Sequence, residues 1–238
     1  MIESVPRILV ILSVLANLGM AGALFLLSNR GERVSGPCGL MGNCAWSNAE
    51  AAQEFSRLPV RPGGVVFLGD SLTAEGPWGE LFSNLLNRGV RGNTVSDVND
   101  RLEEVLSRRP ASLFLMAGIN DLIHGGSEDR VAEGIEAISV RVKRESPDTD
   151  LHVLSLLPIA SGATIMGIDN RTIARLNLSL RKVAQRQKVI FVDLHSRFTD
   201  SEGALRPELT YDGLHLTSRG YLVWRDAIAD YVTPGGGN

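Results

Sequence analysis

From residue 63 to residue 231, short apolar runs alternate with longer amphipathic stretches. Runs of consecutive apolar residues are typical of strands that are buried on both faces of a sheet. The pattern predicts strands at 65–68, 112–117, 150–157 and 189–194, and a further short strand around Val90.

The stretches between these runs carry apolar residues at every third or fourth position, which is the spacing of one face of a helix. Strands that alternate with helices form a mostly parallel sheet with helices on both faces, so the sequence predicts an α/β domain. The helices are predicted over 78–87, 95–106, 131–142, 173–183 and 217–231, the last of them capped by Thr217 or Ser218.

The N-terminal region has a different pattern. Residues 8–27 carry no charged side chain and are long enough to cross a bilayer as a helix. The small residues 21–23 resemble a signal cleavage site, but the apolar run continues through 24–27, which favours an uncleaved membrane anchor over a cleaved signal. A buried helix of a soluble domain is the weakest interpretation, because the segment has no polar face.

Four parts of the chain follow from these patterns. They are an anchor or signal segment at 1–28, a linker at 29–62 with a short helix over 45–57, a globular domain at 63–233 and a flexible tail at 234–238. We expect the globular domain to lie on the periplasmic or extracellular side of the membrane.

Cys38 and Cys44 are the only cysteines, and both fall in the linker. A disulfide between them is expected if this part of the chain lies outside the cytoplasm. Two unrelated thiols are the alternative.

The overall composition narrows the range of partners. The 238 residues are 44% hydrophobic and 21% charged, and the formal net charge is −3. The lack of a basic surplus and an aromatic content of 5% argue against nucleic acid as a partner. No histidine pair has metal-ligand spacing and there is no glycine-rich phosphate loop, so we expect no cofactor. The oligomeric state cannot be read from these patterns.

Polar residues follow the predicted strands at the edge where parallel sheets form their ligand sites. Ser71 follows the first strand in the stretch GDSL, and Asp212 and His215 lie in DGLH, just before the last helix. A serine hydroxyl is a weak nucleophile that needs a histidine base, and this base needs a carboxylate to orient it. We therefore expect Ser71 to be the nucleophile, His215 the base and Asp212 the orienting group.

Acyl transfer also needs hydrogen-bond donors for the oxyanion. Gly92, in GVRGNT, follows the expected second strand, and Asn120, in GIND, follows the third. The expected donors are the backbone N–H groups of Ser71 and Gly92 and the side-chain NH₂ of Asn120, since glycine allows close backbone approach.

Taken in this order, the blocks resemble the SGNH hydrolases, also called the GDSL esterase family. The resemblance spans about residues 65–231 and rests on GDSL, Gly92, GIND and DGLH. It implies a three-layer α/β/α sandwich of the flavodoxin-like kind, with a five-stranded, mostly parallel sheet. It implies the same roles for Ser71, Asp212, His215, Gly92 and Asn120.

Two details refine the resemblance. Ile119 stands where the family pattern more often has a small residue, and we expect it to narrow the pocket. The sequence around the blocks resembles the branch of platelet-activating-factor acetylhydrolase-like and bacterial acetylesterase proteins, which implies short acyl groups.

Other polar residues near the blocks are expected to be structural. Asp70 is expected to bond to backbone at the turn, and Asp121 to cap a helix. His124 is expected on the surface, with pocket lining as its alternative. His152 and His195 are expected to be structural.

Trp78 fits an apolar stripe and is expected in the core. Asn170 and Asn177 match the glycosylation pattern, but the second falls in a predicted helix, and we discount both.

Three functions are compatible with these observations. The first is a serine esterase that hydrolyses short-chain esters, such as acetyl esters, of a carbohydrate or lipid-like substrate outside the cytoplasm. The second is a lysophospholipase, thioesterase or acyltransferase with the same triad, because a membrane anchor brings the domain close to lipids. The third is a non-catalytic module that binds glycan, against which the intact set of Ser71, Asp212 and His215 argues.

Overall fold

The computed structural model describes residues 48–58, 62–162 and 167–232, all within one compact unit, Ala45–Asn238. The expected anchor at 8–27, the pair Cys38 and Cys44, and the tail at 234–238 lie outside the described residues. Across the described part of the chain, no helix is both long enough and apolar enough to cross a bilayer.

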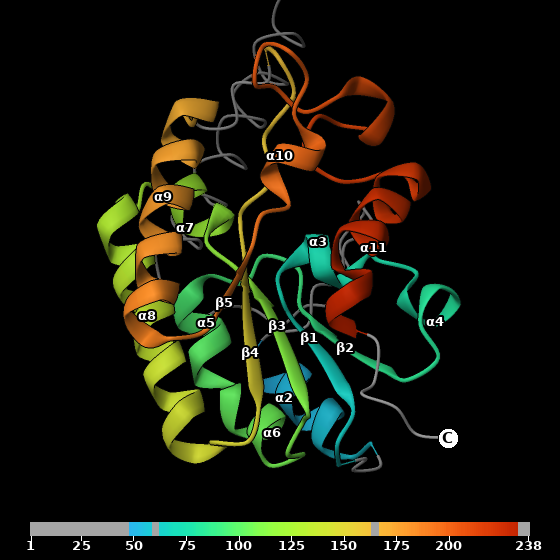
Figure 1. Cartoon of the computed structure of the whole chain (residues 1–238), viewed down its shortest axis with the longest axis vertical. Coiled ribbons are helices and arrows are strands. Elements are labelled where there is room, and N and C mark those ends of the chain that lie inside the picture. The colour runs from blue at the N-terminus through green and yellow to red at the C-terminus, as the bar shows by residue number, and fades with distance from the viewer. Residues whose placement is uncertain (1–47, 59–61, 163–166, 233–238) are drawn as a thin grey trace, which may run out of the picture. The chain divides into compact units, whose positions relative to one another are not determined.

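A five-stranded parallel sheet runs through the centre of this unit, with the spatial order β2-β1-β3-β4-β5 (Figure 1). The predicted α/β fold and the strand number implied by the family resemblance are both confirmed. The strands are β1 (Val65–Gly69), β2 (Leu85–Gly89), β3 (Ser112–Met116), β4 (Asp150–Leu154) and β5 (Ile190–Val192).

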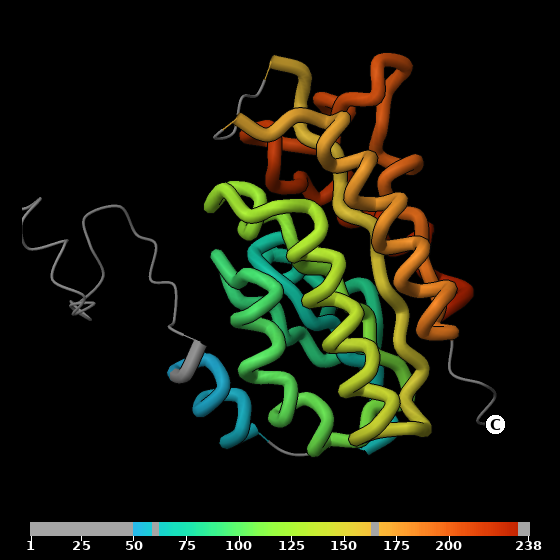
Figure 2. Tube along the Cα trace, turned by 90° about the vertical axis from the view of Figure 1, so that its left-hand side faces the viewer, coloured from blue at the N-terminus to red at the C-terminus, as the bar shows by residue number. Residues whose placement is uncertain are grey.

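Helices cover both faces of the sheet, and Figure 2 shows α8 and α9 side by side across one of them. That face carries α5 (Val95–Asp100), α6 (Leu102–Leu106), α8 (Glu128–Glu145) and α9 (Asn170–Gln187). The other face carries α3 (Ser71–Ala74), α4 (Trp78–Leu81) and α11 (Ser218–Val232). The remaining described elements are α2 (Asn48–Ser56), α7 (Ile119–Ile123), α10 (His195–Phe198) and the 3₁₀ turn η1 (Pro207–Leu209).

The predicted helix over 78–87 is wrong. The helix stops after one turn at Phe82, whose backbone is extended (φ −143°, ψ 133°). The two leucines at 85–86 pair with β1 in the edge strand β2 instead. Short apolar runs fit the apolar face of a helix and a half-buried edge strand equally well. Here the pairing with β1 determines that the segment is a strand. Val90 directly follows this strand, so the strand expected around it lies earlier than predicted.

The predicted helix over 95–106 is interrupted. Arg101 separates α5 from α6, with backbone angles of φ −103° and ψ 10°. Thr94 and Asp97 form a capping box at the start of α5, so this helix has its own N-terminal signal. The break at Arg101 lets its side chain turn inward, where it is 3% exposed.

An aromatic cluster fills the space between β1 and α11. The ring centroid of Trp78 lies 4.7 Å from that of Phe67 and 5.2 Å from that of Trp224, both in edge-to-face geometry. Trp78 is 2% exposed and donates its Nε1–H to the Thr73 carbonyl, which confirms its predicted core position. The cluster holds the strand that leads to Ser71 against the last helix.

A buried ionic cluster connects α2 to the edge of the sheet. The Glu104 carboxylate lies 2.6 Å from Arg108 Nε and 3.4 Å from Arg88 Nε, and none of the three side chains is more than 8% exposed. Arg88 also lies over the ring of Phe55 in α2, and Arg108 donates to the Phe55 carbonyl. A buried charge is tolerated only when it is paired, and the Glu104 carboxylate lies between the two guanidinium groups as a counter-charge to both.

Replacing Glu104 with Gln should lower the free energy of unfolding by about 3 kcal/mol, because the buried carboxylate that both guanidinium groups contact loses its charge. The neighbouring, exposed Glu103 supplies the control variant Glu103→Gln, which should stay within about 0.5 kcal/mol of the parent protein. Denaturant unfolding followed by circular dichroism measures both. Equal stability of the two variants contradicts the role assigned to Glu104.

Candidate active site

Ser71 lies at the carboxyl end of β1, at the first position of α3. Asp70 caps this helix by accepting the Leu72 N–H at 3.0 Å, so its predicted backbone role at the turn is confirmed. Gly69 is required here, since a Cβ at this position would lie 2.3 Å from the Met116 carbonyl oxygen. The resulting turn leaves Ser71 8% exposed at the rim of the sheet.

The base lies on the loop between η1 and α11. Asp212 Oδ1 accepts the N–H groups of Leu214 and His215 at 2.9 and 2.7 Å, which folds the DGLH stretch into a turn. Gly213 has a φ of 91°, a conformation that other residues rarely adopt. This turn brings the Asp212 carboxylate and the His215 imidazole to the same side.

The imidazole of His215 bridges the other two groups. Its Nδ1 lies 2.6 Å from Asp212 Oδ2, and its Nε2 lies 3.0 Å from Ser71 Oγ. A carboxylate can only accept, so Nδ1 carries the proton and donates it to Asp212. Nε2 is then free to accept the Ser71 hydroxyl proton, and the three predicted residues form one hydrogen-bonded chain.

The charge of Asp212 is secured by its surroundings. Partial burial acts to raise its pKa, but the hydrogen bonds from His215 and Leu214 outweigh this and hold the pKa below its usual value. The carboxylate therefore remains ionised at neutral pH and keeps the imidazole in the orientation described above.

The two other predicted oxyanion residues lie on adjacent segments. Gly92 follows β2 with a φ of 78°, and Asn120 lies in α7, directly after β3. Asn120 Nδ2 donates one hydrogen bond to the Asn93 carbonyl at 2.9 Å. The structure thus brings Asn120 and the segment after Gly92 together, while the second hydrogen of this amide is available for a substrate oxygen.

The buried guanidinium of Arg101 holds the segment after Gly92 from the interior of the domain. Its Nη2 donates to the Gly69 carbonyl at 2.9 Å and its Nε to Asn93 Oδ1 at 2.7 Å. Burial lowers the pKa of Arg101 to about 10, so the group stays charged at neutral pH. Arg101 therefore connects the residue before the Ser71 turn to the residue after Gly92.

Three further residues meet at the rim, and the sequence reasoning did not identify them. Glu75 contacts both Arg91 and Tyr211, and it also approaches the imidazole of His215. Arg91 and Tyr211 each directly precede a predicted site residue, which is the one signal in the sequence. The contact between these side chains could not be predicted from the sequence, because Glu75 and Tyr211 are 136 positions apart.

Residues near the third block have mixed outcomes. Asp121 Oδ2 accepts the Val95 N–H at 3.0 Å, so from its place in α7 it caps the start of α5. His124 is exposed, as predicted. Ile119 is 3% exposed and belongs to the hydrophobic core, so the expectation that it narrows the pocket is wrong.

The two histidines expected to be structural and the two asparagines of the glycosylation pattern contact parts of the fold other than the triad side chains. His152 is 3% exposed and stacks on Phe114 with ring centroids 4.3 Å apart. His195 begins α10, and burial lowers its pKa. The side-chain amides of Asn170 and Asn177 bond the backbone of Ile159 and Leu156, which fixes the segment after β4.

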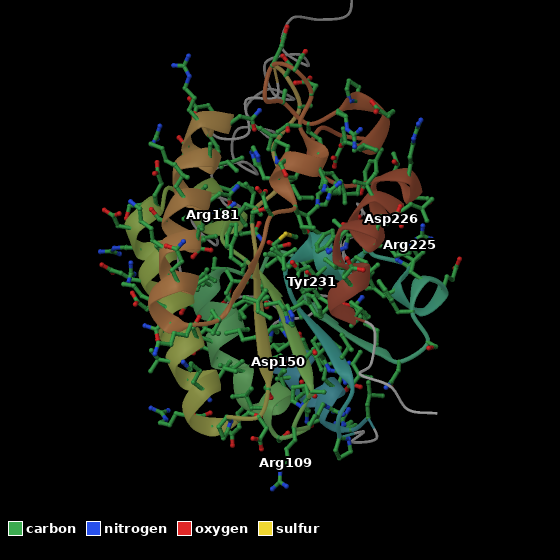
Figure 3. The ribbon with its side chains drawn as sticks, in the orientation of Figure 1. Arg109, Asp150, Arg181, Arg225, Asp226 and Tyr231 are labelled. Carbon is green, nitrogen blue, oxygen red and sulfur yellow. The ribbon has the colours of Figure 1, made fainter. Side chains whose placement is uncertain are left out.

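A pocket of about 760 Å³ lies at the opposite end of the sheet. Its lining includes Val65, Ser112 and Asp150, the first residues of three strands, together with Arg225 and Tyr231 of α11 (Figure 3). Ser71 follows the other end of β1, so this pocket is separate from the triad. Among the described residues, no cluster of His, Cys, Asp or Glu has the makings of a metal site.

A hydrolytic site of the Ser-His-Asp type at the carboxyl edge of a parallel sheet defines the class of protein. The chain belongs to the GDSL-like lipase/acylhydrolase family, whose model matches residues 67–223. The resemblance read from the four blocks is thereby confirmed, and the protein is an enzyme of the ester hydrolase kind.

Similar proteins and similar solved structures support the same family assignment. The platelet-activating factor acetylhydrolase IB subunit alpha2 of Rattus norvegicus is 34% identical over 166 residues, which is 66% of this chain and 70% of that protein. A GDSL-like lipase from Bacteroides thetaiotaomicron is 25% identical with a TM-score of 0.68, over 78% of this chain and 96% of the other. An acetylxylan esterase from Geobacillus stearothermophilus shares the fold, with a TM-score of 0.60 at 18% identity over 75% and 98% of the two chains.

Asp70 gives this site a measurable pH dependence. Complete burial raises its pKa to about 7 from an ordinary value of 3.8, although the Leu72 N–H and the nearby His215 lower it again in part. At this carboxyl the folded protein therefore holds one proton more than the unfolded chain between about pH 4 and about pH 7, and the contribution of Asp70 to stability falls as the pH rises through this window.

Asp70→Asn should remove this loss, because the amide is neutral and its oxygen still accepts the Leu72 N–H. At pH 8 the variant should be more stable than the parent protein by a few kcal/mol, since each pKa unit is worth about 1.4 kcal/mol. Asp148→Asn, at an exposed position, is the control and should keep the parent slope. Thermal unfolding from pH 4 to pH 8 gives the comparison, and an unchanged slope in Asp70→Asn contradicts the account.

Proposed function

We propose that this protein is a serine esterase that removes acetyl or other short acyl groups through an acyl-enzyme intermediate. The observation that carries this proposal is the continuous chain from Asp212 through His215 to Ser71, with contacts of 2.6 and 3.0 Å. In this assignment Ser71 is the nucleophile, His215 the general base and Asp212 the orienting carboxylate.

In the first half of the reaction, Ser71 Oγ attacks the ester carbonyl carbon and passes its proton to His215 Nε2. The carbonyl oxygen becomes an oxyanion, and the N–H groups of Ser71 and Gly92 and the Asn120 amide donate to it. The intermediate collapses with breakage of the bond to the alcohol. His215 returns its proton to the departing alcohol oxygen.

In the second half, water repeats these steps on the acyl-enzyme. His215 Nε2 takes a proton from the attacking water, and the same donors hold the oxyanion. Breakage of the bond to Ser71 Oγ releases the carboxylic acid, and the serine regains its proton from His215.

A short acyl group is favoured by the polar surroundings of the triad. The Glu75 carboxylate lies 3.6 Å from His215 Nε2, and its side chain is 14% exposed. A long alkyl chain packed against this carboxylate would remove water from it and offer no hydrogen bond in return. The 34% identity to a protein named as an acetylhydrolase supports the same choice.

The leaving group is proposed to be a carbohydrate. Tyr211 is 62% exposed beside the triad and offers an apolar ring face, while its hydroxyl and the Glu75–Arg91 pair offer hydrogen bonds. A sugar presents both a C–H face and hydroxyl groups, so it can use both. A lipid headgroup phosphate is less favoured, because Arg91 is already paired with the Glu75 carboxylate, which would repel a phosphate.

The location outside the cytoplasm and the attachment through residues 8–27 belong to this proposal as well. Their support is the uncharged run in the sequence. A lysophospholipase, thioesterase or acyltransferase with the same triad is the second candidate, and the uncharged run at 8–27 favours it, because an anchor there would bring the domain close to lipid.

Ser71→Ala should reduce kcat for p-nitrophenyl acetate by about 10⁴-fold or more, as expected when a triad member is lost. Ser83→Ala is the matched control, because Ser83 is exposed and lines the pocket at the other end of the sheet. Steady-state kinetics on both purified variants give the ratio. Turnover that survives intact in Ser71→Ala excludes the proposed nucleophile.

The acyl preference distinguishes the two candidate functions. We expect kcat/KM to fall from acetyl to octanoyl to palmitoyl p-nitrophenyl esters, because the charged rim disfavours long alkyl chains. A steep rise with chain length would support the lipid-directed function instead. The same assay with acetylated xylo-oligosaccharides and with lysophospholipids then compares the two classes of leaving group directly.

A further inference from the structure

We propose that Glu75 is a positioning residue whose carboxylate ties together the three segments that carry the nucleophile, the base and the oxyanion donors. This inference rests on the esterase function proposed above. Glu75 lies outside the triad and the set of oxyanion donors. Its proposed role is to fix the positions of the base and of the oxyanion segment relative to Ser71.

Glu75 is fixed to the nucleophile through the backbone. It ends α3 one turn after Ser71, and its N–H donates to the Ser71 carbonyl at 3.0 Å. Its side chain is 14% exposed, so the carboxylate is held mostly away from water. The carboxylate and the nucleophile therefore belong to one short, rigid segment.

The first tie runs from Glu75 to the base. Its Oε2 accepts a hydrogen bond from the Tyr211 hydroxyl at 2.8 Å. Tyr211 directly precedes Asp212, and its ring stacks on the imidazole of His215 with centroids 5.9 Å apart. Desolvation and the bond to Glu75 raise the pKa of Tyr211 to about 12, so the hydroxyl remains a donor at neutral pH.

The second tie runs from Glu75 to the oxyanion segment. Arg91 Nη1 lies 2.7 Å from Glu75 Oε1, and Arg91 directly precedes Gly92. Because the carboxylate is mostly withdrawn from solvent, this pair is screened less than a fully exposed one. The ion pair restrains the backbone next to an expected oxyanion donor.

The same carboxylate also restricts the position of the His215 imidazole. Glu75 Oε1 lies 3.6 Å from His215 Nε2, the nitrogen that contacts Ser71 Oγ. This separation is too long for a hydrogen bond, so Glu75 does not replace Asp212 as the partner of the base. The Glu75 carboxylate instead limits how far the imidazole ring of His215 can rotate.

Triad chemistry is sensitive to such restraints, since a displacement of about 1 Å can cost about 10²-fold in rate. One carboxylate that holds Tyr211 and Arg91 sets the positions of the base and the oxyanion segment relative to Ser71. Loss of the carboxylate should therefore affect the chemical step more than substrate binding.

The kinetic test uses four variants. Glu75→Ala and Glu75→Leu should each lower kcat for p-nitrophenyl acetate by about 10-fold to 100-fold with KM little changed. Glu75→Gln should recover part of kcat, because its amide oxygen still accepts from Tyr211. Glu80→Gln, on the exposed side of α4, is the control and should retain the parent kcat. Parent kcat in Glu75→Ala overturns the proposal, as does full recovery by Glu75→Leu.

A double-mutant cycle tests whether the partners act through Glu75. Tyr211→Phe and Arg91→Met should each lower kcat a few-fold in the parent protein, because each cuts one tie. In the Glu75→Ala background the same changes should have no further effect. Effects that persist in full in that background overturn the proposal.

Amide hydrogen exchange supplies a readout that does not depend on turnover. Exchange at 91–94 and 210–216 should be faster in Glu75→Ala than in the parent protein and unchanged in Glu80→Gln. Unchanged exchange in both segments of Glu75→Ala overturns the proposal whatever the activity. Faster exchange in a protein without Ser71-dependent turnover contradicts the esterase function and leaves the positioning role supported.

Discussion

The site depends on one interaction, the hydrogen bond between the His215 imidazole and the Ser71 hydroxyl. The two residues are 144 positions apart, so nothing local can bring them together. The parallel sheet does so, because it delivers the carboxyl end of β1 to the edge where the loop before α11 also lies. The polar chain continues to Asp212, whose two oxygens hold both the imidazole and the turn that carries it.

Two charged side chains, Arg101 and Glu75, hold the segments at the carboxyl edge of the sheet in position. Arg101 bonds the backbone before the nucleophile and the side chain after Gly92, and it stays charged in the interior. Glu75 lies at the rim, where its carboxylate contacts Arg91 on one segment and Tyr211 and His215 on another. Both groups are desolvated, so each is useful only while its partners are in place. The arrangement that makes the site rigid also makes it sensitive to single substitutions.

Much of this account could be predicted from sequence patterns. Uninterrupted apolar runs identify β1 and β3, because central strands of a parallel sheet are buried on both faces. The pattern predicts a helix at the edge strand β2, because the half-buried leucines of this strand fit either period and only pairing with β1 decides. The triad was readable because its residues lie in short blocks at element ends. The contacts of Glu75 were not, because they join side chains that are distant along the chain.

The central claim is that Ser71 is an activated nucleophile, and covalent labelling measures this most directly. Treating the intact protein with a fluorophosphonate and mapping the adduct by peptide mass spectrometry should place a single label on Ser71. The label should be lost in His215→Ala, since an unactivated hydroxyl reacts poorly. Absence of labelling at Ser71, or equal labelling in His215→Ala, would contradict the account.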